Sequence, residues 1–207
     1  MSKPKAAAAP DPYLHIHGQG KLWLTDEKDS PLLVVFGGID VGGVHSGVYM
    51  WNYMSALKNR YHIFVALSNS VNGTLAYRGV MRKLGEADID ITPSEQILYL
   101  FSGGYRPGMD VLNSSGPGTF SKILLVDIWM GAKSVADYYR KLADTNAGKM
   151  TYTYTSFGAN DPETRDYIAN RLGPTRSTHV EAHVDGKKKE AGMATHMRTN
   201  TMAIMDL

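Results

Sequence analysis

The feature that most constrains the fold is an alternation of short apolar runs with longer segments of helical pattern. Runs of this kind are typical of strands buried on both faces of a parallel sheet, because helices cover both faces. Apolar runs occupy residues 32–36, 62–67, 97–101 and 122–129, and two further strands are expected at 149–157 and 178–184. Helical patterns occupy residues 47–60, 74–87, 133–144, 161–173 and 196–207.

The chain begins with a different pattern. Residues 13–18 and 21–26 alternate apolar and polar side chains on either side of Gly18 and Gly20, which predicts an antiparallel hairpin. With the hairpin the expected strands number eight, and strand–helix alternation implies right-handed crossovers. The sequence therefore predicts an α/β fold: a three-layer α/β/α sandwich with a mostly parallel eight-stranded sheet, in one domain over residues 13–207.

Composition excludes several classes of function. Lys and Arg number 22 and Asp and Glu 20, which gives no electrostatic case for binding nucleic acid or an anionic membrane. The chain has no cysteine, so disulfides, thiolate metal sites and a cysteine nucleophile are excluded. Residues 1–12 lack the apolar core of a signal peptide and are expected to form a disordered tail, and no window resembles a membrane span. We expect a soluble protein that is cytoplasmic or exported without a cleavable signal peptide.

Ser102 stands where the fifth expected strand ends. The apolar run 97–101 leads directly into Ser102, which is followed by Gly103, Gly104 and a segment that could be helical. A serine at a sharp strand-to-helix turn can present a nucleophile, but a serine at the start of a helix can also be only a cap. The residues themselves leave both roles open.

The strand order and this turn together resemble the α/β-hydrolase superfamily, in particular its small lidless esterase, thioesterase and cutinase-like members. The core of that family has eight strands, the second antiparallel, and its nucleophile follows the fifth strand in a G-x-S-x-G elbow. Gly104 matches the later glycine, whereas Leu100 stands at the earlier one, so the elbow is divergent. The resemblance implies hydrolysis of acyl esters or thioesters by a Ser-His-Asp triad, with Ser102 as the nucleophile and without a cofactor.

The loop after the third strand is glycine-rich where the resemblance requires it. The family stabilises the oxyanion with the backbone N–H of the residue after the nucleophile and with an N–H from this loop. These positions are Gly103 and, in the loop, Gly38 or Ile39. A glycine-rich turn before a helix can also bind phosphate, but this loop matches neither the dinucleotide-binding motif nor the P-loop.

The resemblance leaves two candidates for the acid of the triad. The family usually carries the acid after strand seven, which is Asp161 here, and some members carry it after strand six, which is Asp127. Asp161 is the first choice and Asp127 the second. Each also has a structural interpretation, since Asp161 could cap a helix and Asp127 could be a buried residue at a strand end.

The histidine of the triad comes last in the family's chain order. His196 lies between the eighth expected strand and the last helix, where the family carries its base, so it is the first choice, and His183 is the second. His15 and His17 share one face of a strand and could contribute to a metal site, but a third ligand is missing from the pattern, so no metal is expected.

The segment between strands six and seven is long enough for one crossover helix, so no lid is expected and the site should be open. Tyr105 and Arg106 directly follow the turn and are candidates for contacts with a small acyl substrate. The alternative function is a catalytically inactive α/β-hydrolase-like protein that binds a partner or a ligand. Fold cannot separate the two functions.

Overall fold

A computed structural model describes residues 13–86, 88–116, 118–156, 161–181 and 188–207. The strands are β1 (Leu14–Ile16), β2 (Gly20–Trp23), β3 (Leu32–Phe36), β4 (His62–Ala66), β5 (Gln96–Phe101), β6 (Lys122–Val126), β7 (Met150–Thr155) and β8 (Ser177–Val180). The α-helices are α1 (Ser46–Met54), α2 (Gly73–Leu84), α3 (Tyr105–Ser114), α4 (Lys133–Asn146), α5 (Pro162–Leu172) and α6 (Lys188–Ile204). None of the helices in these ranges is long and apolar enough to cross a membrane.

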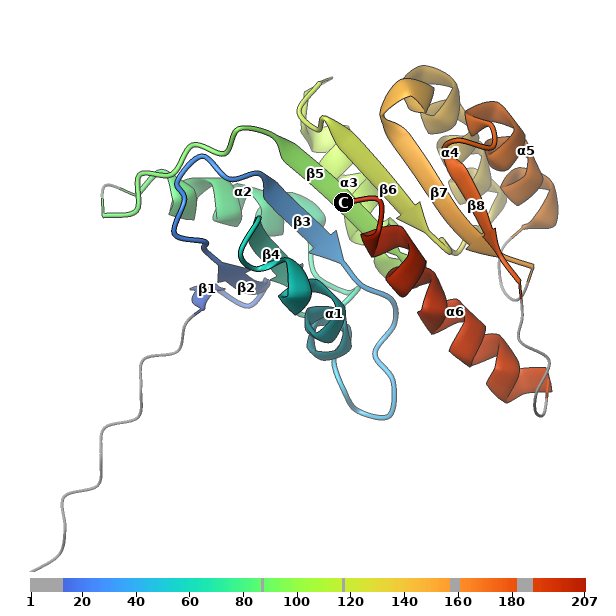
Figure 1. Cartoon of the computed structure of the whole chain (residues 1–207), viewed down its shortest axis with the longest axis horizontal. Coiled ribbons are helices and arrows are strands. Elements are labelled where there is room, and N and C mark those ends of the chain that lie inside the picture. Colours follow the sequence, from blue (N-terminus) through green and yellow to red (C-terminus); the bar gives the residue numbers. More distant parts are fainter. Residues whose placement is uncertain (1–12, 87, 117, 157–160, 182–187) are drawn as a thin grey trace, which may run out of the picture.

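All eight strands join one sheet in the order β1-β2-β4-β3-β5-β6-β7-β8 (Figure 1). The hairpin strand β2 pairs antiparallel with β4, and every pair from β4 to β8 is parallel. The predicted fold class, including the N-terminal antiparallel hairpin, is therefore confirmed. The central strand β5 lies between β3 and β6, so its carboxyl end is in the middle of the sheet, where sites form in open α/β folds.

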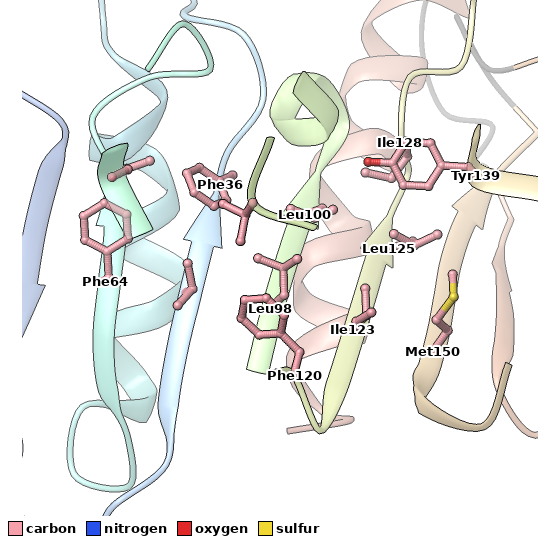
Figure 2. Close-up of a cluster of buried hydrophobic side chains, with 14 of the residues drawn as sticks. Phe36, Phe64, Leu98, Leu100, Phe120, Ile123, Leu125, Ile128, Tyr139 and Met150 are labelled. Carbon is pink, nitrogen blue, oxygen red and sulfur yellow. The ribbon is translucent and has the colours of Figure 1, made fainter. Parts of the chain in front are cut away.

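Helices cover both faces of the sheet, with α1 and α6 on one side and α2, α3, α4 and α5 on the other (Figure 1). This double cover explains why the central strands read as continuous apolar runs. Successive residues of β5 point to opposite faces: Leu98 and Leu100 pack in the cluster under α2–α5, and Tyr99 and Phe101 pack under α1 and α6. Figure 2 shows the first of these clusters, with Leu98 and Leu100 inside it.

The last helix differs most from the sequence-based expectation. α6 begins at Lys188 and not near His196, and β8 ends at Val180. The sequence pattern predicts only residues 196–207 of this helix, and several side chains on its buried face are polar: Thr195, Thr199 and Asn200. Asn200 accepts a hydrogen bond from the Tyr99 hydroxyl at 2.8 Å, so this polar face is anchored to the middle of the sheet.

The connection between β6 and β7 carries α4 and a short 3-10 turn at Ala147–Lys149. It contains no inserted domain that could act as a lid. The carboxyl end of the sheet is therefore not covered from this connection.

Candidate active site

Ser102 lies in a strained turn at the carboxyl end of β5. Its φ is +51°, the left-handed region that a residue with a side chain seldom occupies, at a cost of about 1–2 kcal/mol. A 3-10 turn runs from Ser102 to Gly104, and α3 follows at once. The positive φ predicted for Ser102 is therefore confirmed, and Ser102 is the first residue of the 3-10 turn and not its N-cap.

Leu100, the residue that departs from the family's elbow pattern, is accommodated by a glycine on the next helix. A Cβ placed on Gly108 of α3 would lie 2.6 Å from both terminal methyl carbons of Leu100. Helix α3 thus crosses β5 with Gly108 directly over the Leu100 side chain. The small residue that the pattern requires two positions before the serine is replaced by a small residue six positions after it.

The loop after β3 packs closely against the serine turn. In the β3–β5 register Phe36 pairs with Leu100, which brings the next residues of the two strands together. A Cβ on Gly38 would lie 3.1 Å from the Cβ of Ser102, and a Cβ on Gly104 would lie 2.3 Å from the carbonyl oxygen of Phe36. Only glycines allow the two segments to approach this closely.

This approach brings the backbone of Ile39 close to Gly103. The backbone nitrogen of Ile39 lies 3.3 Å from the position that a Cβ on Gly103 would take. The Tyr49 hydroxyl donates to the carbonyl oxygen of Ile39 at 2.8 Å, which holds the loop in this position. Burial, followed by the nearby Asp40 carboxylate, raises the pKa of Tyr49 to about 12, so the hydroxyl remains a donor at neutral pH.

Asp127 takes the same place on β6 that Ser102 takes on β5. The strands pair Phe101 with Val126, so the two next residues are neighbours at the sheet end. The φ of Asp127 is +44°, and its side chain is almost completely buried. Among the described residues other than glycine, only Ser102, Asp127 and Asp90 have a positive φ. Two of these three strained positions therefore lie side by side at the centre of the sheet.

Hydrogen bonds fix the Asp127 carboxylate and connect it to a histidine. The backbone N–H of Thr155 donates to Oδ1 at 3.0 Å, and the Thr155 hydroxyl donates to Oδ2 at 2.9 Å. Nδ1 of His196 lies 2.6 Å from Oδ2, a short distance typical of a charge-assisted bond. The Nδ1–H therefore donates to the carboxylate, and this tautomer leaves Nε2 as the proton acceptor of the ring.

The His196 ring lies against the residue that precedes Ser102. It stacks on Phe101 with the ring centroids 4.6 Å apart and the planes 30° apart. Its side chain is 24% exposed, so substrate and water can reach it. Within the described ranges the Ser102 hydroxyl forms no hydrogen bond. Serine–histidine contacts are often long in enzymes without substrate and tighten when substrate binds.

The first choice for the acid requires a correction. Asp161 is not brought to His196: its Oδ2 accepts from the backbone N–H of Thr164 at 3.2 Å and caps α5. The guanidinium of Arg140 lies 3.9 Å from the same oxygen. The carboxylate that contacts the histidine is the second choice, Asp127. The histidine is placed differently as well, because His196 lies inside α6 and not before it.

The other expected site residues have varied positions. Arg106 is exposed and donates from Nε to the hydroxyl of its neighbour Tyr105 at 3.1 Å, so the two side chains pair with each other. Tyr105 also packs at the edge of the apolar cluster under α2–α5. His183 lies outside the described residues. In the described ranges no group of three or more His, Asp or Glu side chains is arranged to hold a metal ion.

A second serine–histidine pair lies at the edge of the sheet. The Ser156 hydroxyl is 2.7 Å from Nε2 of His179, and both residues are exposed. In the part of the chain that the structure describes, no carboxylate contacts His179, and the φ of Ser156 is not positive. This pair lacks both the orienting acid and the strained backbone of the central site.

Comparison with known proteins gives structural neighbours but no sequence relatives. No family model and no curated protein matches the chain. The esterase domain of a Rhodothermus marinus protein is 8% identical, with a TM-score of 0.53 over 90% of this chain and 90% of its own. Est1E from Butyrivibrio proteoclasticus is 10% identical, with a TM-score of 0.52 over 92% of this chain and 96% of its own. The LpqC poly(3-hydroxybutyrate) depolymerase from Bordetella parapertussis is 12% identical, with a TM-score of 0.50 over 88% of this chain and 84% of its own. At these identities the likeness establishes the fold and no more.

Proposed function

Since the chain has the α/β-hydrolase fold, we propose that it is a serine hydrolase that cleaves acyl ester or thioester bonds. The observation that carries the proposal is the strained Ser102 turn beside the hydrogen bond between the buried Asp127 carboxylate and the partly exposed His196 ring. A strained backbone persists only where the surrounding structure enforces it, and such positions cluster at functional sites.

In the proposed mechanism Ser102 Oγ attacks the carbonyl carbon of the substrate while Nε2 of His196 takes the hydroxyl proton. Asp127 holds the ring through Nδ1 and stabilises the imidazolium that forms. The hydrogen bonds from Thr155 keep the carboxylate oriented toward the ring. The leaving alcohol or thiol then takes the proton from Nε2, and an acyl-enzyme remains on Ser102.

The negative charge that develops on the substrate oxygen is stabilised by the backbone N–H groups of Gly103 and Ile39. The Ile39 backbone nitrogen lies beside Gly103, which supports this role, and the hydrogen bond from Tyr49 limits reorganisation of the loop during the reaction. Water, activated by His196, then attacks the acyl-enzyme and releases the carboxylic acid. No metal or cofactor is needed for any of these steps.

The surroundings of the turn support an apolar acyl group as the substrate. The Ile39 side chain is 55% exposed, and its Cγ2 lies 3.1 Å from the position of a Cβ on Gly103. The Trp129 side chain is 45% exposed, and its backbone N–H donates to the Ser102 carbonyl at 3.3 Å. The exposed Ile39 beside Gly103 and the exposed Trp129, whose backbone contacts the turn, offer apolar surface to the acyl chain. Tyr105 and Arg106 remain candidates for contacts with a more distant polar part of the substrate.

The proposal is tested by labelling purified protein with a fluorophosphonate probe and by measuring hydrolysis of p-nitrophenyl butyrate. Wild type should be labelled and active, and Ser102→Ala should lose both properties while its thermal unfolding stays close to wild type. The matched control is Ser156→Ala, which removes the other histidine-paired hydroxyl and should keep full labelling. Loss of labelling in Ser156→Ala but not in Ser102→Ala would refute the assignment of Ser102.

A binding protein of the same fold is the second candidate. The observation in its favour is that the Ser102 hydroxyl makes no hydrogen bond to His196 in the described structure. A serine without this contact is not activated as a nucleophile. A wild type that is folded, hydrolyses no ester and resists the probe would support this candidate and contradict the hydrolase.

A further inference from the structure

The loop between β4 and α2 brings a side-chain amide to the serine turn. Nδ2 of Asn69 lies 2.9 Å from the position that a Cβ on Gly103 would take. The backbone nitrogen of Ile39 lies 3.3 Å from the same position. The amide and one proposed oxyanion donor therefore converge on one side of Gly103, although they come from different loops.

The residues around Asn69 hold the loop in place. The hydroxyls of Ser68 and Ser70 are 2.6 Å apart, and the backbone N–H of Ser70 donates to the Ser68 hydroxyl at 3.1 Å. Ser68 is buried, and Asn72 caps α2 by accepting from the N–H of Leu75 at 2.9 Å. The residues on both sides of Asn69 are thus held by hydrogen bonds, and this support favours a single orientation of its side chain.

The Asn69 amide itself is not used in holding this loop. Within the ranges that the structure describes it makes no hydrogen bond, and the residue is partly exposed beside the turn. A polar group that is supported by its neighbours, lies beside Gly103 and makes no hydrogen bond within the described ranges is available to a substrate. An amide N–H₂ offers two donors and suits an oxygen that gains negative charge.

We propose that Asn69 is a further catalytic residue, whose side-chain amide donates a hydrogen bond to the substrate oxyanion together with the N–H groups of Gly103 and Ile39. The inference rests on the proposed hydrolase function and adds to it a donor that the family's two-backbone pattern does not contain. A donor fixed in advance stabilises the transition state more than the bound substrate. Its removal should therefore lower kcat much more than it changes KM.

The test compares Asn69→Ala, Asn69→Asp and wild type in ester hydrolysis by the full chain. Both variants should lower kcat by about 10²-fold and leave KM within about threefold, because each removes the donor. Asn69→Asp keeps the size and shape of the side chain, so a packing role alone would spare this variant. The matched control is Asn113→Ala on the exposed surface of α3, which should equal wild type.

The outcomes separate the inference from the proposed function. If wild type is active, Ser102→Ala is inactive, and Asn69→Ala retains a kcat within about threefold of wild type, the Asn69 inference is overturned while the hydrolase stands. A rise in KM at unchanged kcat would also overturn it, because it would show equal binding of substrate and transition state. Thermal unfolding of each variant shows whether a lost rate reflects lost structure. An inert wild type would overturn both proposals.

Discussion

The connections that follow β6 and β7 each contain an aspartate, Asp127 and Asp161, yet the two residues are held in opposite ways. Asp127 is buried, adopts a left-handed backbone, and receives hydrogen bonds from β7 and from α6. Asp161 keeps an extended backbone and caps the helix that it precedes. A carboxylate whose hydrogen bonds come from the next turn of the chain, as in Asp161, does not orient a distant side chain. The Asp127 carboxylate is instead held by residues that are distant in the sequence.

The roles of the two aspartates are distinguished most clearly by neutralising each carboxylate without changing its shape. Asp127→Asn should lower kcat by about 10⁴-fold, because an amide at this position favours the wrong imidazole tautomer and cannot stabilise the imidazolium. Asp161→Asn should stay within about twofold of wild type, since asparagine caps helices as well as aspartate does. Both variants are compared in ester hydrolysis, with thermal unfolding as the control. A larger loss of activity in Asp161→Asn would return the acid to the turn after β7.

Leu100 packs closely against Gly108 beside the strained turn after β5, and a double-mutant cycle tests whether the turn depends on this contact. Gly108→Ala should destabilise the protein by about 1–3 kcal/mol, because the new methyl group overlaps the Leu100 side chain. It should also lower ester hydrolysis at least tenfold by moving α3 and the turn, an effect of about 1.4 kcal/mol on the barrier.

The second variant of the cycle is Leu100→Ala, which makes room for the added methyl group. In the Gly108→Ala background it should restore activity, although it removes apolar contacts of its own. Denaturant unfolding and ester hydrolysis are measured for both single variants and the double variant. Strictly additive effects would show that the two residues do not interact, and that the divergent elbow is tolerated for another reason.

The smallest expected effect concerns Asp161 as a helix cap. Asp161→Ala should lower the free energy of unfolding by about 1 kcal/mol at pH 7 and leave the rate of hydrolysis unchanged. The hydrogen bonds from Thr164 lower the pKa of Asp161 in the folded protein. The charged cap is therefore stabilising above the pKa of the unfolded chain, and this contribution is lost as the pH falls through the lower folded-state value. Urea unfolding should accordingly show a smaller difference from wild type at pH 3 than at pH 7, and a constant difference would contradict the capping interpretation.

The sheet and the position of the serine can be predicted from the amino-acid sequence. Continuous apolar runs identify the buried parallel strands, and the glycines after Ser102 and in the loop after β3 mark the tight approach that the structure contains. These features are readable because each follows from local rules of burial and backbone freedom, which act within a few residues.

The identity of the acid that contacts the histidine depends on the tertiary structure. Asp127 and His196 are 69 residues apart, and their contact depends on the direction in which α6 crosses the sheet. The packed face of that helix mixes the polar Thr199 and Asn200 with the apolar Ala203, so its pattern predicts a helix but not the direction in which the helix crosses the sheet. The space for Leu100 is likewise provided by Gly108 on another element. In both cases the interaction joins residues on different elements, and the residues next to them in the chain do not predict it. Hydrogen bonds and steric fit depend on distance in space and not on separation along the chain.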